Sequence, residues 1–148
     1  IIVVSLGARY RNYCSNISRT FFVDPPKKVS GTYEVLMEMQ DACLAAMKPG
    51  NQLKAVYKAA VAFLQERSGY EYLVDHLPKS LGYATGLDFR ESAFSLTAKN
   101  PASFKKGMVF CLSIGFQNLE LSESDLSSTP DKSPVSLQRV SVYRAVIV

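Results

Sequence analysis

Few side chains in this sequence could carry out chemistry by themselves, and they are widely separated. His76 is the only histidine, and a lone histidine is more often a surface residue than a general base. The three cysteines, Cys14, Cys43 and Cys111, form no C-x-x-C pair, which argues against a disulfide framework or a structural zinc site and indicates a reducing, intracellular compartment. A catalytic pair of His76 with one of the cysteines is an alternative, although their spacing in the sequence does not indicate one.

Charged residues and glycines near position 88 have simpler explanations than catalysis. Asp88 and Glu91 could act as paired carboxylates, but simpler roles for them are to neutralise Arg90 or to face solvent. Gly82 and Gly86 form Gly-x-x-x-Gly without the Lys-Ser/Thr pair that a phosphate-binding loop requires. Residue types and spacing alone therefore predict no catalytic centre.

The composition is that of one globular domain. The chain has 148 residues, of which 47% are hydrophobic, enough for one core but not for two ordinary domains. No segment approaches the roughly 18 to 20 apolar residues that a membrane span needs, so none is predicted. The chain begins and ends in apolar, β-type runs, and we expect it to be part of something longer.

The net charge of +4 is unevenly distributed along the chain. Residues 117–134 carry a net charge of −3, which leaves +7 on the rest. Such a surplus is compatible with nucleic acid or an acidic protein as a partner, but scattered basic residues are more typical of a solvated surface.

Apolar patterns predict the elements that would position any site. β-branched runs at 1–6 and 17–23 predict a hairpin, which the prolines at 25 and 26 end. Apolar residues at three- and four-residue intervals predict amphipathic helices at 32–47 and about 52–67, separated by a Pro-Gly turn.

The rest of the chain is expected to form strands and loops. Residues 70–76 suit either a short helix or an irregular loop. Strands are predicted at residues 87–89, 94–97, 108–116 and 135–148. The Ser-, Asp- and Pro-rich segment at about 120–134 is predicted to be a flexible loop.

Four motifs in a fixed order carry a family resemblance. They are S-L-G-A at 5–8 with Y-C-S-N-I-S-R-T-F at 13–21, K-P-G at 48–50, G-Y-A-T-G-L-D-F-R-E at 82–91 and K-G-M-V-F-C-L-S at 106–113. They resemble D-x-G-A with Y-x-S-D-I-x-R-T-F, K-P-G, G-H-G-x-G-L-x-x-H-E and G-M-V-F-T-I-E of the methionine aminopeptidase, prolidase and creatinase family. The resemblance implies an α+β pita-bread fold, with a curved antiparallel sheet and two amphipathic helices. Residues 1–148 would form its C-terminal portion, a partial aminopeptidase-like domain.

The resemblance also implies which residues stand at the family's metal ligands. Enzymes of the family hold two divalent metals with two Asp, one His and two Glu, and a metal-bound hydroxide is the nucleophile. The matching residues are Ser5, Asn16, Tyr83, Ser113 and, by a less direct match in the terminal strand, Tyr143. Neutral hydroxyls and an amide cannot offset two divalent charges, so no metal, no other cofactor and no hydrolysis are expected. A second family histidine is matched by Arg90, which cannot shuttle protons near neutral pH.

Within this fold family, two motifs resemble the large subunits of the histone chaperone FACT. They are Y-C-S-N-I at 13–17 and G-L-D-F-R-E-S at 86–92, the latter followed by Lys99-Asn100. The resemblance implies a nuclear, chromatin-associated module that binds histones H3-H4 in transcription and replication. It also implies an HMG-box small subunit of FACT as a partner, through other parts of the full-length protein.

Three residues are candidates for binding a peptide around the altered cleft: Arg19, Tyr83 and Arg90. Each also has a structural interpretation, since Arg19 could pair with a carboxylate, Tyr83 could fill the volume of the metals, and Arg90 could be held by Asp88 or Glu91. The acidic segment near 120–134 is another possible histone contact. An RNA- or ribosome-associated pseudo-aminopeptidase of the proliferation-associated type, and a hydrolase with a remodelled site, are the alternatives.

Overall fold

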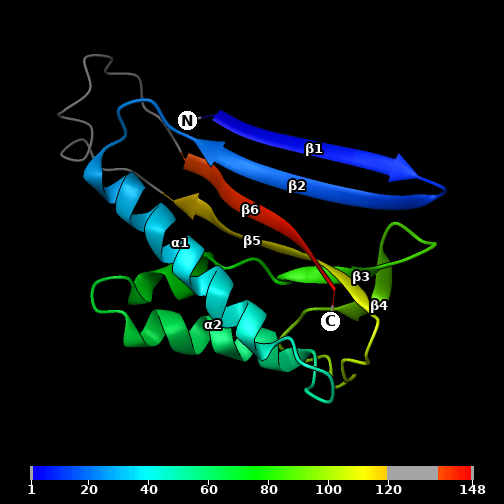
Figure 1. Cartoon of the computed structure of the whole chain (residues 1–148). Coiled ribbons are helices and arrows are strands. Elements are labelled where there is room, and N and C mark those ends of the chain that lie inside the picture. The colour runs from blue at the N-terminus through cyan, green and yellow to red at the C-terminus, as the bar shows by residue number, and fades with distance from the viewer. Residues whose placement is uncertain (1, 120–136, 148) are drawn as a thin grey trace.

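Nine secondary-structure elements follow one another in the part of the chain that the computed structural model describes, residues 2–119 and the backbone of 137–147 (Figure 1). They are β1 (Ile2–Tyr10), β2 (Tyr13–Phe21), α1 (Lys27–Ala46), α2 (Lys54–Glu66), the 3-10 helix η1 (Glu71–His76), β3 (Gly82–Thr85), β4 (Glu91–Ser95), β5 (Val109–Leu119) and β6 (Leu137–Ile147). Helices and antiparallel strands together confirm the predicted α+β class. The loop predicted at about 120–134 lies outside the described residues.

The strands form one six-stranded sheet in the order β1-β2-β6-β5-β3-β4, and every neighbouring pair is antiparallel. The β1-β2 hairpin turns at Arg11 and Asn12, whose φ angles of 45° and 71° match the short hairpin turns that require positive φ. Strand β6 lies between β2 and β5 (Figure 1). The sheet therefore places the N-terminal hairpin beside strands from the second half of the chain.

Helix α1 begins five residues before the predicted start at 32. Pro26 lies at its N-terminal boundary, where its carbonyl accepts hydrogen bonds from the backbone N–H groups of Val29 and Ser30 at 2.9 and 3.2 Å. The polar first turn has little apolar periodicity, which explains the error. Helix α2 confirms the second predicted helix, with an end one residue earlier than expected. Among the described residues, none of the helices is long and apolar enough to cross a membrane.

The strand predicted at 87–89 is wrong. These residues form an exposed turn in which the backbone N–H of Gly86 donates to the carbonyl of Asp88 at 3.1 Å. The strand in this region is instead β3, which has only four residues and pairs with both β4 and β5. A run this short between glycines gives little alternation to detect. The ambiguous segment at 70–76 is the 3-10 helix η1.

The core lies between the two long helices and one face of the sheet (Figure 1). Alternate residues of β5 point toward the helices and are fully buried: Phe110, Leu112, Ile114 and Phe116. They pack with buried residues of α1 and α2, among them Leu36, Met39, Cys43, Val56, Ala60 and Leu64. The other residues of β5 lie on the opposite face, where the candidate site is found.

Candidate functional site

Strand pairing brings the matched metal-ligand positions to one face of the sheet. The register pairs Ser5 with Ser18, Ser18 with Tyr143, and Tyr143 with Ser113 across β1, β2, β6 and β5. Directly paired residues of antiparallel strands share a face, as do alternate residues of one strand. Asn16 lies two residues from Ser18 on β2, and the register therefore gathers positions that are far apart in the sequence.

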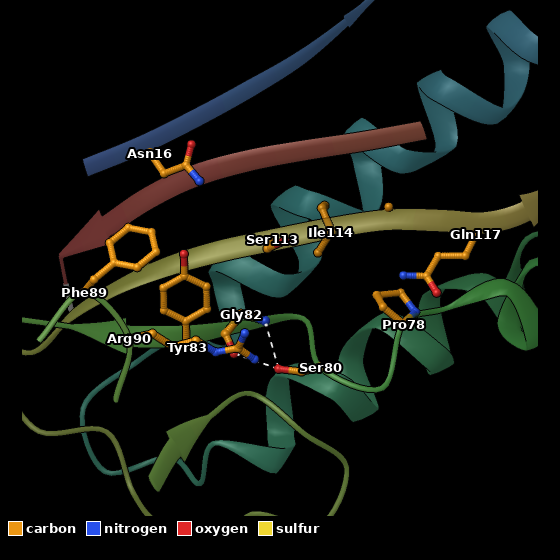
Figure 2. Close-up of a pocket in the computed structure, with 11 residues that line it drawn as sticks. Asn16, Pro78, Ser80, Gly82, Tyr83, Phe89, Arg90, Ser113, Ile114 and Gln117 are labelled. Atoms are coloured by element: carbon orange, nitrogen blue, oxygen red, sulfur yellow. Dashed lines mark hydrogen bonds between the residues drawn. The ribbon is translucent and has the colours of Figure 1, made fainter. Parts of the chain in front are cut away.

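A pocket of about 300 Å³ opens on this face (Figure 2). Its lining residues come from β2, the segment between η1 and β3, β3 itself, the loop between β3 and β4, and β5. They are Asn16, Pro78, Ser80, Gly82, Tyr83, Phe89, Arg90, Ser113, Ile114, Gly115 and Gln117. Ser5 is exposed beside the pocket, where its hydroxyl donates to the side-chain oxygen of Asn16 at 3.4 Å. The structure thus brings Asn16, Tyr83, Arg90 and Ser113 together.

Tyr83 is the central side chain of the pocket. Figure 2 shows its hydroxyl pointing toward the strand that carries Asn16, with Phe89 beside its ring. The ring centroids of Tyr83 and Phe89 are 5.9 Å apart. Burial raises the pKa of the Tyr83 phenol to about 12, and the Cys111 thiol adds to this rise, while the Asn16 amide and the Arg90 guanidinium act in the opposite direction. The phenol is therefore a neutral hydroxyl at physiological pH.

Arg90 supplies the positive charge of the pocket. Its guanidinium carbon lies 5.1 Å from the centroid of the Tyr83 ring, within the range of a cation-π contact. Within the described part of the chain, no ion pair joins Arg90 to Asp88 or Glu91, which differs from the neutralising role considered from the sequence. Glu91 lines a second pocket of about 420 Å³ instead.

Arg19 does not line this pocket. It lies on β2, half-buried, and its guanidinium donates to the backbone carbonyl of Ser18 at 2.8 Å. Because side chains alternate along a strand, Arg19 is on the face opposite to Asn16. Sequence reasoning placed it near the cleft because it belongs to the same motif, and motif membership carries no information about faces.

Three lining residues with polar or aromatic side chains were not expected from the sequence. Phe89 was assigned to a strand, and its position next to Arg90 was the signal that could have revealed it. Gln117 continues the alternation of Ser113 and Gly115 along β5, so the strand period could have found it. Ser80 had no sequence signal; its hydroxyl donates to the carbonyl of Gly82 at 2.8 Å.

The lining residues do not suit a pair of divalent cations. One cation and no carboxylate face the pocket among the residues that line it. In the described part of the chain, no group of three or more His, Cys, Asp or Glu side chains is placed to hold a metal ion. Serine, amide and phenol groups leave divalent charge uncompensated, and the guanidinium of Arg90 would repel it. The metal-dependent reaction of the fold's enzymes therefore has no ligand set in this pocket.

Within the residues that the structure describes, the contacts of His76 are structural, and none of them is with a cysteine. Its Nδ1 atom lies 2.8 Å from the carbonyl oxygen of Gln117, and its ring meets that of Tyr72 at 6.2 Å between centroids. These contacts tie the end of η1 to β5. They give the Cys-His alternative no support.

The three thiols are expected to react with Ellman's reagent at different rates. Cys43 and Cys111 are buried, and burial raises the pKa of both thiols, that of Cys43 to about 12. Cys14 is only partly buried. Because the thiolate is the reactive form, one thiol should react in the native chain and the other two only after unfolding in guanidinium. A Cys14→Ser variant should lose the fast phase; a second fast thiol would contradict the buried positions.

Comparison with known proteins agrees with this architecture. The model of metallopeptidase family M24 matches residues 1–138. The chain is 45% identical over 120 residues to the FACT complex subunit SPT16 of Zea mays. This match covers 81% of this chain and 11% of the maize protein. It resembles the solved N-terminal domain of SPT16 from Cicer arietinum with a TM-score of 0.87 and 40% identity, covering 99% of this chain and 32% of that one.

Peptidases share the same architecture at lower identity. The prolidase of Pyrococcus furiosus aligns with 99% of this chain and 37% of its own, at a TM-score of 0.75 and 26% identity. The chain thus spans about a tenth of the length of the SPT16 relative and about a third of the solved domain and of the prolidase. It belongs to metallopeptidase family M24, has the pita-bread fold of that family, and is similar to the N-terminal domain of the FACT subunit SPT16.

Proposed function

We propose that this chain is a catalytically inactive, peptidase-like binding module of a nuclear histone chaperone, and that it binds histones H3-H4 during nucleosome reorganisation in transcription and replication. The similarity to SPT16 supports the chaperone assignment, because the relatives that match at 45% and 40% identity carry that name. Since the chain spans 11% of the length of the maize relative, the activity of the whole protein is part of the proposal.

The residue types in the pocket are the main support for the proposed loss of catalysis. A hydrolase of this family needs carboxylates and an imidazole at positions that here hold Ser5, Asn16, Tyr83 and Ser113. The concave, polar pocket is still present between β2, β3 and β5. A concave surface beside strands suits an extended segment of another protein, so recognition without cleavage is the role that these residues support.

Retention of H3-H4 by the immobilised chain at low ionic strength is the expected result of the direct test. Arg90→Ala should weaken retention by roughly 5- to 30-fold, as is usual when a central interface arginine is removed. Arg11→Ala is the matched control, since Arg11 also lies over a tyrosine ring, 5.4 Å from the centroid of Tyr10, but does not line the pocket. Absence of retention at low salt would contradict histone binding.

Binding to RNA distinguishes the proposed histone-binding function from the main alternative, an RNA- or ribosome-associated pseudo-aminopeptidase. The charge of +7 outside residues 117–134 gives a modest electrostatic reason for binding nucleic acid. Salt-sensitive retention on RNA, without retention of H3-H4, would favour the proliferation-associated type of pseudo-aminopeptidase. The two columns should therefore be run with the same preparation of the chain.

A further inference from the structure

We infer that the pocket of Tyr83 and Arg90 selects a carboxylate, and that its ligand is an acidic peptide segment rather than a basic histone tail. This inference deepens the proposed function, because it names the part of a protein partner that the pocket receives. It rests on the charge, the donors and the size of the pocket. The acidic group belongs either to an Asp or Glu side chain or to the C-terminus of a chain.

The charge of the pocket is positive and not compensated from within. Its lining residues include one cation, Arg90, and no carboxylate. In the described part of the chain, Arg90 makes no ion pair and no side-chain hydrogen bond, and its guanidinium lies over the ring of Tyr83. A lysine or arginine of a basic tail would meet a like charge here, whereas a carboxylate would meet its counter-charge.

The arrangement of Arg90 suits a carboxylate in particular. A guanidinium presents its N–H donors in a planar fork that matches the two oxygens of a carboxylate. The contact with the Tyr83 ring restrains Arg90 while leaving its donors without a partner among the described residues. Arg90 is exposed, so these donors are accessible to a ligand.

Neutral hydrogen-bonding groups surround the charge. Asn16, Ser113 and Gln117 line the same pocket, and Figure 2 shows them on the strands that form its wall. The hydroxyl of Tyr83 keeps its proton at physiological pH, because burial raises its pKa to about 12, and it can therefore donate. A carboxylate that enters the pocket loses bound water, and this loss is costly unless the carboxylate is paired with a charge and hydrogen-bonded. The cation and the surrounding donors together meet both conditions.

The size and the rim of the pocket limit the ligand. A volume of about 300 Å³ is at the lower end of ligand pockets, which run from about 300 to 1,000 Å³, so it admits one or two side chains. Phe89 lines the pocket with 52% of its surface exposed, and Leu87 in the same turn is 77% exposed. Residues next to the acidic group are therefore expected to be apolar.

Fluorescence anisotropy with four labelled probe peptides tests the inference. Three peptides have amidated C-termini and alternate leucine with glutamate, glutamine or lysine; the fourth is the glutamine peptide with a free carboxylate end. The glutamate peptide should bind about tenfold more tightly than its glutamine counterpart, which corresponds to one charge-assisted hydrogen-bonded contact. If the pocket takes a chain end instead, only the fourth peptide should show the gain.

Variants assign the preference to the pocket. Arg90→Gln should abolish the preference for a carboxylate, Arg90→Lys should keep part of it because it retains the charge without the fork, and Arg11→Gln should leave it unchanged. Thermal unfolding of each variant checks its fold, and Arg90→Lys alone decides the question if Arg90→Gln does not fold. In that variant, a full preference would place the carboxylate elsewhere.

Several outcomes would overturn the inference. Among them are equal binding of the amidated glutamate peptide and both glutamine peptides, tighter binding of the lysine peptide, and a preference that Arg90→Gln does not change. Loss of H3-H4 retention with an intact carboxylate preference would refute only the histone assignment. H3-H4 retention that is insensitive to Arg90, with no preference among the peptides, would refute only the role of the pocket.

Discussion

A variant with restored ligands is expected to hold two divalent metal ions per chain, whereas the natural chain holds none in stoichiometric amount. The substitutions are Ser5→Asp, Asn16→Asp, Tyr83→His, Ser113→Glu and Tyr143→Glu. Incubation with Mn²⁺ or Co²⁺, gel filtration and elemental analysis would measure the bound metal. Since outer-shell partners alone account for roughly 10- to 100-fold in metal affinity, the gain should be at least about 100-fold.

The register of the sheet is the reason to expect this gain. Tyr143 is the direct neighbour of both Ser113 and Ser18, and Ser5 is the direct neighbour of Ser18 on its other side. Asn16 and Tyr83 line one pocket with Ser113. Carboxylates and an imidazole at these positions would therefore lie on one face, and oxygen and nitrogen ligands are those that such metals prefer.

An amide variant is the matched control for the restored ligands. It carries Ser5→Asn, Tyr83→His, Ser113→Gln and Tyr143→Gln and keeps Asn16, so that it has similar shape without the negative charge. It should retain little metal. If the carboxylate variant folds and binds no more metal than the amide variant, the matching of these positions to the family ligands is wrong. The proposed inactivity would be refuted if the natural chain held two metal ions and cleaved short methionine- or proline-led peptides in a metal-dependent reaction.

Periodicity predicted the long elements, because burial on one side leaves a repeating signal. Helices α1 and α2 bury residues such as Leu36, Met39 and Leu64 at helical spacing, and β5 alternates between Phe110, Leu112 and the site face. Short elements lack such a signal. β3 has four residues and contacts strands on both sides, so its existence depends on pairing partners that are distant in the sequence.

The site was predictable only as far as family motifs reach. Asn16, Tyr83, Arg90 and Ser113 were named from matched motifs, and the structure places all four in one pocket. Arg19 belongs to the same motif as Asn16 but lies on the other face, because neighbouring strand residues alternate. The pairing of Arg90 with the Tyr83 ring, instead of with an adjacent carboxylate, depends on three-dimensional packing that no local pattern encodes.

Gly82→Ala is expected to lower the free energy of unfolding by about 3 to 5 kcal/mol, a loss typical of severe strain in a packed region. Gly82 begins β3 with a φ of +151°, a conformation that residues with a side chain rarely adopt. A Cβ atom there would overlap the carbonyl oxygen of Cys111 and come within 3.1 Å of Leu96 Cδ1 and 3.2 Å of Leu112 Cα. Backbone atoms of β5 cannot move aside without disturbing the sheet.

Gly107→Ala separates the two causes of this loss. Gly107 has a φ of +88°, but nothing lies within 4 Å of the position its Cβ would take. Strain without overlap should cost only about 1 to 2 kcal/mol in urea unfolding. Because Gly82 also lines the pocket beside Tyr83, its substitution should reduce peptide binding, while Gly107→Ala should not. Equal losses of stability in both variants would mean that β3 and β5 are not held as close together as the present register requires.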